Sequence, residues 1–401
     1  MKPAFAPISK GKGIVLLLMS AFLLFHSITI AQPGSYDPAK VNKKAVEMYE
    51  KAIAAAGEGN YKLSLPYLYS SLKHDKRYLE AYLSIAGIYG ELKQYDSAII
   101  NYEIAKDIDS AFFQDYNLPY SINLAGKGQF QKAYSAVQSF LSLPYLNEKS
   151  RMAGEYRQKC YAFAIDYEAG NPNKEYKFEP QNLGDGINSE FSEYYPSITI
   201  DGSKLIFTRK VKGFNEDFFE THHENNGWGM PSTLQGEINT NLNEGALTIS
   251  QDGQWLIFTG CNFPDGYGSC DLYISYLTKD GWSAPENLGD RLNSEFWDAG
   301  PTLSPDKREL YFASARPGGY GGIDLYVSHR LPNGKFGEPE NLGPEINTAG
   351  NESTPFMHAD NQTLYFTSNG HIGYGGDDLF LSKKGSKNTW SKPRNLGFPI
   401  N

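Results

Sequence analysis

Two hydrophobic patterns follow one another along this chain. From about residue 43 to residue 167, apolar side chains recur every three or four positions, which is the spacing of amphipathic helices. From residue 180 to residue 401, short apolar runs such as 205–208 and 256–259 are separated by turns rich in Gly, Asn and Asp, which is typical of β-hairpins. The pattern predicts a multidomain α + β chain, with a helical region before an all-β region.

Three segments of the helical region repeat one pattern. Each segment starts with an aromatic residue, at Tyr61, Tyr95 and Phe130, and these starts lie 34 and 35 residues apart. A single helix pair cannot bury its apolar face alone, so stacked neighbours complete the core. We therefore expect an α-solenoid of about three helix pairs, closed by a capping helix from Asn147 to about Tyr167.

The middle segment resembles a tetratricopeptide repeat. The residues at that family's signature spacings are Tyr82, Ala86, Tyr89, Ala98, Tyr102 and Ala105. The small alanines would let two antiparallel helices approach closely, with the tyrosines beside them. The resemblance implies a groove that binds a peptide or a partner protein, and the alternative is a simple spacer.

The β region has a longer period. The sequence Asn-Leu-Gly, or Leu-Gln-Gly in one copy, places leucines at 183, 234, 288, 342 and 396, which are 51, 54, 54 and 54 residues apart. Each unit contains three or four short strands joined by turns, and such a unit forms one blade of a β-propeller. The chain therefore holds four complete blades and the start of a fifth unit.

Each unit also carries an acidic residue just before its first strand. These residues are Glu193, Glu244, Asp298 and Glu352. A propeller would arrange them in a ring, which could hold a cation or a basic segment of a partner. Alternatively, each acid accepts backbone N–H bonds and ties neighbouring blades together. We favour this second role because the acid recurs in every blade.

The β units look like the WD40-like (PD40) blades of the TolB type, and Ser304-Pro305-Asp306 is the best match to the turn of that family. Tetratricopeptide-like repeats followed by such blades resemble the N-terminal part of OmpA-family envelope proteins of Bacteroidetes. One of those proteins is a component of the type IX secretion machinery. The resemblance implies a non-enzymatic envelope scaffold that binds protein partners. Binding or sensing of a glycan or peptidoglycan fragment is the alternative.

Closure of the propeller has two possible forms. Four blades close if the strand near 176–183 or the strand near 390–396 seals the ring. Otherwise the four blades are part of a larger, open ring, and we favour this form because the last segment repeats the start of a blade so faithfully. An open sheet edge is a site for pairing with another chain.

The N-terminus has the order of a secretory signal. Lys2, Lys10 and Lys12 precede an apolar stretch at 14–25, and Thr29 and Ala31 place small residues before a cleavage point. We expect a signal peptide at 1–31 and a mature chain without a transmembrane span. An uncleaved anchor is the alternative. The expected location is the periplasm or the periplasmic face of the outer membrane, with possible outer-membrane association.

Charge and composition narrow the class of protein. The chain has 37 Lys and Arg against 46 Asp and Glu, and residues 180–401 alone carry a net charge of −12, which argues against binding to nucleic acid. A mean hydropathy of −0.48 excludes a polytopic membrane protein. The shift in charge near Gly170 places a helical domain at 32–169, a linker at 170–179 and the propeller at 180–401.

Little in the sequence predicts catalysis. The Gly-rich loops at 318–322 and 373–376 precede strands and lack the Lys-Ser/Thr of a phosphate loop. His222 and His223 would point to opposite faces of a strand, so we expect no shared metal. We find no catalytic set and expect no enzyme activity and no cofactor, although a sialidase-like hydrolase is the enzymatic alternative for a propeller. Cys261 and Cys270 flank one hairpin, and a disulfide is expected between them in an oxidising compartment, two free thiols being the alternative.

Overall fold

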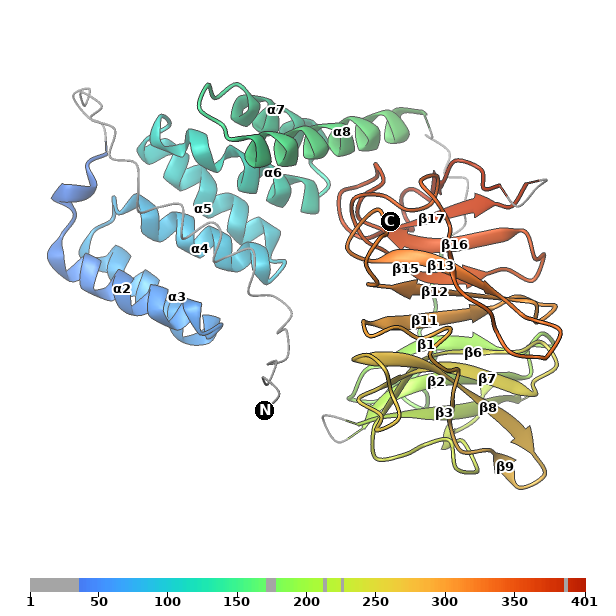
Figure 1. Ribbon diagram of the computed structural model, residues 1–401. Helices are drawn as coiled ribbons and strands as arrows, with labels where there is room; N and C mark the ends of the chain where they lie inside the picture. Colours follow the sequence, from blue (N-terminus) through green and yellow to red (C-terminus); the bar gives the residue numbers. More distant parts are fainter. Residues whose placement is uncertain (1–35, 171–177, 212–214, 225–226, 386–388) are drawn as a thin grey trace, which may run out of the picture. The chain divides into compact units, whose positions relative to one another are not determined.

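The computed structural model describes residues 36–170, 178–211, 215–224, 227–385 and 389–401 (Figure 1). The predicted signal peptide and most of the predicted linker lie outside these ranges. The chain divides into two compact units, Met1–Ala162 and Phe163–Asn401. In the described part of the chain, no helix is both long and apolar enough to span a bilayer.

The helical unit contains seven α-helices within the described residues. They are α2 (Lys43–Gly57), α3 (Tyr61–His74), α4 (Leu79–Glu91), α5 (Tyr95–Ile108), α6 (Asn117–Gly126), α7 (Phe130–Leu141) and α8 (Glu148–Gly170). The short 3₁₀ turns η2 (Pro38–Lys40) and η3 (Phe112–Tyr116) complete this unit. Tyr61, Tyr95 and Phe130, the predicted repeat starts, each begin a helix.

The helices pack as successive pairs, α2 with α3, α4 with α5 and α6 with α7. Ala86 on α4 and Ala98 on α5 are fully buried, and the absence of larger side chains there allows the two helices to approach closely. Tyr102 is buried beside them, in edge contact with Phe113 at a ring separation of 6.2 Å. Helix α8 follows the third pair and buries Cys160.

Apart from the end of α8, which extends past Ala162, the second unit consists of four blades built from short antiparallel strands. Blade 1 contains β1 (Glu193–Ile198), β2 (Lys204–Val211), β3 (Asn215–Glu224), β4 (Gly227–Trp228) and β5 (Ser232–Thr233). Blade 2 contains β6 (Asn243–Ile249), β7 (Trp255–Cys261), β8 (Cys270–Thr278), β9 (Gly281–Trp282) and β10 (Glu286–Asn287). Blade 3 contains β11 (Asp298–Leu303), β12 (Glu309–Ser314), β13 (Asp324–His329) and β14 (Glu340–Asn341). Blade 4 contains β15 (Glu352–Met357), β16 (Thr363–Ser368), β17 (Asp378–Lys383) and β18 (Arg394–Asn395).

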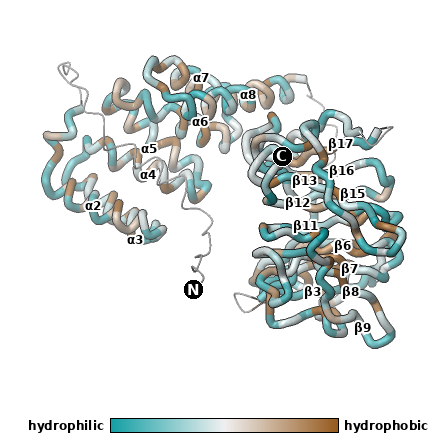
Figure 2. The backbone as a smooth tube through the Cα atoms, in the orientation of Figure 1, coloured by the Kyte–Doolittle hydropathy of each residue, from teal (hydrophilic) through white to brown (hydrophobic). Residues whose placement is uncertain are grey.

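The blades follow one another as an open array. The first strands lie in sequence, with β1 against β6, β6 against β11 and β11 against β15, and no comparable contact joins β15 to β1 within the described residues. Hydrophobic residues concentrate in the strands, whereas the connecting loops are largely hydrophilic (Figure 2). The expected fold class, a helical solenoid followed by a propeller-type β domain, is confirmed.

Every first strand contains a β-bulge two residues after its acid. The pairing register shifts at this point in all four blades. The bulged residues, all with φ between 48° and 63°, are Tyr195, Ala246, Gly300 and Thr354. A bulge bends the strand and increases its twist, so the same device recurs at the inner strand of each blade.

An asparagine side chain fastens the loop at the end of each blade to its third strand. In blade 3, Asn347 Nδ2 donates to Leu325 O at 2.9 Å and Leu325 N donates to Asn347 Oδ1 at 2.8 Å. The corresponding asparagines, each bound to both backbone groups of one residue in their own blade, are Asn239, Asn293 and Asn401. The side-chain amide thus takes the place of a backbone N–H and C=O that would otherwise pair with this residue in a sheet.

We predict that the Asn347→Leu variant loses about 2–4 kcal/mol of folding stability, because it leaves a buried N–H and a buried C=O without partners. The matched control is Asn188→Leu. Asn188 occupies the same place in the repeat, but within the part of the chain that the structure describes its side chain hydrogen-bonds only to Asn182, at 2.8 Å. Urea denaturation of dilute protein should therefore show a change of under about 1 kcal/mol for the control. Equal losses in both variants would contradict this account.

Candidate interaction face of the propeller

One end of each blade gathers the recurring polar residues, and we call this end the loop end. The strand register places three residues side by side in each blade. They are the acid of the first strand, a residue near the end of the second strand, and an aspartate at or near the start of the third strand. In blade 3 these are Asp298, Ser314 and Asp324, which are direct partners across β11, β12 and β13. The same rows in the other blades are Glu193–Arg209–Asp217, Glu244–Gly260–Asp271 and Glu352–Ser368–Asp378.

The acid of the first strand binds the loop that leads into its own blade. Asp298 Oδ2 accepts from the backbone N of Ser294 at 2.6 Å and from its hydroxyl at 2.7 Å. Glu352 binds the N–H and the hydroxyl of Thr348 in the same way, at 2.7 Å each. The acids thus hold the crossover loops between blades, through a Ser or Thr four residues earlier. That four-residue spacing is visible in the sequence.

The remaining hydrogen-bond capacity of these carboxylates is satisfied by a different donor in each blade. Arg209 Nε donates to Glu193 at 2.8 Å, and Arg316 Nη2 donates to Asp298 at 2.8 Å. In blade 4 the hydroxyl of Ser368 donates to Glu352 at 2.6 Å. Sequence reasoning missed these three partners, because the donor is an arginine in blades 1 and 3 but a serine hydroxyl in blade 4, so no single residue type recurs.

Blade 2 lacks such a partner. The position opposite Glu244 is Gly260, so no side chain reaches the carboxylate from β7. Glu244 is fully buried, its Oε1 accepts from the Thr240 hydroxyl, and its Oε2 has no hydrogen-bond partner. Burial raises the pKa of Glu244 to about 7, from an ordinary value of 4.5.

The aspartate of the third strand shapes the Gly-rich loop before it. Asp324 accepts from Tyr320 N at 2.6 Å and from Gly321 N at 2.9 Å. Asp271 makes the same two bonds with Tyr267 N and Gly268 N, at 2.6 and 3.0 Å. These loops are therefore rigid turns rather than phosphate-binding loops, in agreement with the absence of Lys-Ser/Thr from their sequence.

Glycine is required in these loops by close approach to the next blade. A Cβ placed on Gly321 would lie 2.0 Å from Gly350 O, and one placed on Gly268 would lie 1.7 Å from Phe296 O. Each loop thus packs closely against the next blade at its glycine, while the neighbouring tyrosine lies outside that contact.

The loop end exposes aromatic side chains in successive blades. Tyr267 and Tyr320, at equivalent positions, are 48% and 50% exposed. Phe191 and Phe296, also at equivalent positions, are 44% and 45% exposed. We call these four residues the aromatic row. Sequence reasoning did not single them out, although the repeat places them at fixed offsets from the acids.

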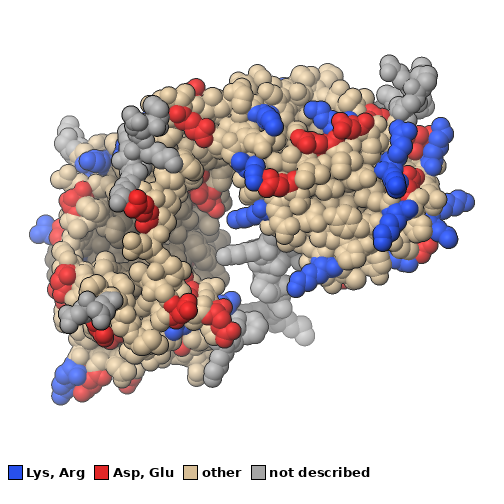
Figure 3. All heavy atoms as spheres, turned by 180° about the vertical axis from the view of Figure 1, so that it is seen from behind, with Lys and Arg blue, Asp and Glu red and all other residues tan. Residues whose placement is uncertain are grey.

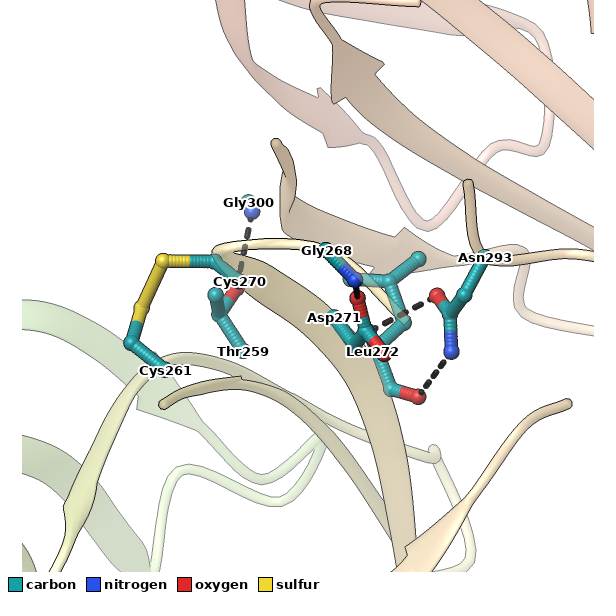
Figure 4. Close-up of a disulfide and its surroundings, with 8 residues drawn as sticks. All are labelled: Thr259, Cys261, Gly268, Cys270, Asp271, Leu272, Asn293 and Gly300. Carbon is teal, nitrogen blue, oxygen red and sulfur yellow. Dashed lines mark hydrogen bonds between the residues drawn. A yellow bond between two sulfur atoms is a disulfide. The ribbon is translucent and has the colours of Figure 1, made fainter. Parts of the chain in front are cut away.

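Cys261 and Cys270 form a disulfide between opposed positions of β7 and β8, with their Cα atoms 4.0 Å apart (Figure 4). Close to it, Gly300 N of blade 3 donates to Thr259 Oγ1 of blade 2 at 3.0 Å. The Asp271 and Asn293 bonds described above lie on the same strand, β8. The disulfide thus joins the two strands that carry the contacts to blade 3.

The opposite end of the blades, the turn end, contains a hollow that sequence reasoning missed. It has a volume of about 660 Å³, and its lining includes Arg308, His329, Arg330 and Lys384. Lys384 is neutralised by Glu309, at 2.6 and 2.7 Å. Arg330 stacks over the Trp255 ring at 4.5 Å, and its Nε donates to Gly334 O at 3.1 Å. The lining also includes the acidic Asp306 and Glu309, so the hollow combines cationic and acidic groups in a domain that is otherwise strongly acidic.

Other predicted chemistry does not assemble into a site. No three His, Cys, Asp or Glu side chains among the described residues lie close enough together to share a metal ion. His222 lies 3.7 Å from Glu220, whereas His223 packs edge-on against Trp228 at 5.2 Å. The four acids of the first strands belong to separate blades and do not converge on one point.

The helical-repeat residues have structural positions. Ala86, Ala98, Tyr102 and Ala105 are buried between helices, and the Tyr82 hydroxyl donates to Lys76 O at 3.3 Å. The hydroxyls of Tyr89 and Tyr69 lie 2.9 Å apart on neighbouring helices.

Seen from behind, the helical unit carries many of the visible Lys and Arg residues, while the propeller surface in this view is mostly acidic or uncharged (Figure 3).

We predict that Glu244→Gln stabilises the protein at pH 8 by about 1–3 kcal/mol and changes little at pH 5. With a raised pKa, folded Glu244 holds a proton that the unfolded chain has lost, so wild-type stability falls as pH rises from about 5 to about 7. The amide removes that slope.

The matched control is Glu352→Gln, at the same position in blade 4. Glu352 accepts three bonds, so its amide variant should lose about 1–3 kcal/mol at both pH values. The measurement is urea denaturation at pH 5 and pH 8. Parallel pH profiles for wild type and Glu244→Gln would show that Glu244 is not the titrating group.

Comparisons with known proteins assign no family to this chain. No protein-family model matches the sequence, and no curated protein matches it. Among solved structures, TolB from Acinetobacter baumannii is 16% identical with a TM-score of 0.33, over 51% of this chain and 46% of TolB. An α-L-arabinofuranosidase from Lactobacillus brevis is 13% identical with a TM-score of 0.34, over 53% of this chain and 76% of the enzyme.

A structure described as one of two prolyl endopeptidases is 14% identical with a TM-score of 0.31, over 61% of this chain and 35% of the enzyme. The chain thus spans less than half of the TolB chain and about a third of the endopeptidase. Scores of this size carry no inference about activity, so function is argued below from the residues of this chain.

Proposed function

We propose that this protein is a non-enzymatic scaffold of the bacterial cell envelope, which binds protein partners through its helical groove and the faces of its propeller. The setting that the sequence resemblance implies is an outer-membrane or type IX secretion-related assembly. The proposal requires no cofactor, no metal and no nucleic acid.

The aromatic row is the observation that carries this proposal. Aromatic residues, Tyr and Phe among them, are enriched in the cores of protein interfaces, and Tyr is also enriched among the residues that carry most of the binding energy. Here they recur at fixed positions in neighbouring blades, so they form a repeated feature of one face. A partner with apolar side chains or an extended apolar segment fits such a row.

The supporting structure holds the row in place. The backbone N–H of Tyr320 is bound to Asp324, and the equivalent bond of Tyr267 goes to Asp271. Phe296 N donates to Ser294 Oγ at 3.2 Å, and Ser294 is itself fixed by Asp298. Loops restrained in this way lose little entropy on binding, which favours affinity.

A second candidate function, binding of a glycan or peptidoglycan fragment, is favoured by the hollow at the turn end. Arg308 and Arg330 lie within it, and Arg308 is 3.9 Å from Asp306 with 83% of its side chain exposed. Guanidinium groups bind carboxylates in bidentate fashion, and peptidoglycan fragments carry carboxylates. A ligand of the hollow would carry carboxylates, whereas a partner of the aromatic row would present apolar side chains.

We predict that replacing both Tyr267 and Tyr320 by Ala lowers capture of envelope proteins at least tenfold, because two interface anchors are lost. The immobilised full chain is incubated with a detergent-solubilised envelope extract, and bound proteins are quantified by mass spectrometry. The melting temperature should change little, since both side chains are half exposed.

Two controls separate the candidate functions. Tyr145→Ala removes a tyrosine that is 64% exposed outside the propeller and should leave capture unchanged. The Arg308→Ala/Arg330→Ala double variant is tested against soluble muropeptides by calorimetry. Muropeptide binding that this variant abolishes, together with unchanged protein capture in the tyrosine variant, would favour the glycan function over the scaffold.

We also predict that the mature protein starts at Gln32. The basic, apolar and small-residue order at the N-terminus favours cleavage after Ala31. N-terminal sequencing of the protein from the envelope fraction checks this point. A chain that begins at Met1 would instead indicate an uncleaved anchor.

A further inference from the structure

The last turns of α8 show how the loop end of a blade holds an aromatic helix. These turns belong to the second unit, which begins at Phe163. Phe163 and Tyr167 both contact the ring of Tyr374, in the Gly-rich loop of blade 4, with ring centroids 5.8 and 6.3 Å from it. Residues four apart lie on one face of a helix, so α8 presents an aromatic pair to this loop.

The Asn-Leu-Gly turn at 395–397 completes the place where this helix lies. The Tyr167 hydroxyl donates a long hydrogen bond, of 3.5 Å, to Leu396 O. A Cβ placed on Gly397 would lie 2.1 Å from Tyr167 Cζ, so the tyrosine ring rests directly on the glycine and a larger residue would exclude it. We call the tyrosine of the Gly-rich loop together with the Asn-Leu-Gly turn of the same blade its tyrosine niche.

Blades 2 and 3 contain the same niche. Tyr267 and Tyr320 lie four residues before the aspartate of the third strand, as Tyr374 does, and the Asn-Leu-Gly turns lie at 287–289 and 341–343. In all three blades the backbone N–H of the tyrosine donates to that aspartate. The loop that carries the tyrosine is therefore fixed in the same way in each blade.

The niches of blades 2 and 3 are uncovered in the described part of the chain. A Cβ placed on Gly289 or Gly343 would meet no atom within 4 Å, in contrast to Gly397. Residues 395–397 are buried, whereas their counterparts in blades 2 and 3 are partly exposed. The tyrosines of these two niches are about half exposed, as noted above for the aromatic row.

The carbonyl of the turn is also left outside the sheet ladder. In blade 3, Leu325 N donates to Asn347 Oδ1 rather than to Leu342 O. Asn293 causes the same exchange in blade 2. In blade 4, the equivalent exchange leaves Leu396 O to accept from the helix.

One bond of blade 4 cannot form in blade 3. Phe398 N donates to the Tyr374 hydroxyl at 3.1 Å. The residue after the Asn-Leu-Gly turn of blade 3 is Pro344, which has no N–H. The Tyr320 hydroxyl is thus left to bond with a partner rather than with its own blade.

From these observations we propose that the niches of blades 2 and 3 bind a helix of a partner protein, in which an aromatic residue is followed four positions later by a tyrosine. The proposal rests on the scaffold function proposed above and names the chemistry of the partner. The first ring packs against Tyr267 or Tyr320. The second lies on Gly289 or Gly343, and its hydroxyl donates to the turn carbonyl. A tyrosine suits this place because it buries a large apolar ring and still offers a polar end.

The test uses the full chain and a synthetic helix that copies residues 157–170 of α8. In the peptide, Cys160→Ala removes the thiol. Tyr161→Glu and Ile165→Lys, joined by a lactam on the face away from Phe163, keep this short segment helical. Calorimetry is expected to show saturable binding of two peptides per chain.

Three variants define what the binding depends on. Tyr167→Ala in the peptide and Tyr267→Ala/Tyr320→Ala in the chain should each weaken binding about tenfold or more, because each removes a ring from the contact. Tyr145→Ala in the chain is the matched control and should leave binding unchanged, since this exposed tyrosine lies outside the propeller. Equal binding of the peptide with and without Tyr167 would overturn the proposal.

A photochemical cross-link locates the peptide. Benzophenone-alanine replaces Phe163 in the peptide, and the linked residues of the full chain are mapped by mass spectrometry. Links are expected at Tyr267 and Tyr320 or in the turns at 287–289 and 341–343. Links confined to blade 4 would show that the peptide only displaces α8 from its own place, and would overturn the proposal.

The outcome is separable from that of the scaffold function. No peptide binding, together with envelope capture that depends on Tyr267 and Tyr320, would overturn the helical partner and leave the scaffold function standing. Peptide binding at both niches, together with capture that does not depend on these tyrosines, would support the niches and contradict the scaffold function.

Discussion

The capture of backbone groups by buried polar side chains is the interaction on which the propeller depends. Blades 1 to 3 each end in a loop that leaves the sheet and enters the next blade, and the backbone N–H and C=O groups near that loop lack ladder partners. Asn347 provides a donor and an acceptor to Leu325, and Glu352 provides acceptors to Thr348. Because an unpaired buried backbone group costs free energy comparable to a lost hydrogen bond, these residue types must recur wherever the loop recurs.

This requirement explains why the fold could be predicted so far from the sequence. The periods of 34 to 35 and 51 to 54 residues follow from repeated elements that must each bury one face, and the structure confirms the helix starts and the four blades. The acids and asparagines were visible as repeated letters. Their hydrogen-bond partners were not, because a carboxylate accepts equally well from Arg209, Arg316 or Ser368. Different residue types therefore donate the same hydrogen bond to the carboxylate in different blades, and the repeat pattern of the sequence does not show this.

The site-level features that sequence reasoning missed share a different cause. The hollow at the turn end combines Asp306, His329 and Lys384, which come from three separate strands and turns. No local pattern joins such residues, so only the register of the blades reveals them. The aromatic row was within reach, since its members lie at fixed offsets from the repeated acids. A tyrosine in a Gly-rich loop is ambiguous in sequence, however, because its exposure depends on whether the next blade covers it.

Blade 2 shows how a repeat tolerates the loss of one member of such a network. Gly260 removes the partner of Glu244, and the buried carboxyl responds by holding its proton to a higher pH, which avoids an uncompensated charge. The same blade carries the Cys261–Cys270 disulfide, which joins β7, the strand of Gly260, to β8. A covalent link there keeps β7 and β8 together where the polar network is weakest. The rigidity of the loop end is thus maintained by different chemistry in each blade, and this rigidity is what fixes the spacing of Tyr267, Phe296 and Tyr320 on the exposed face.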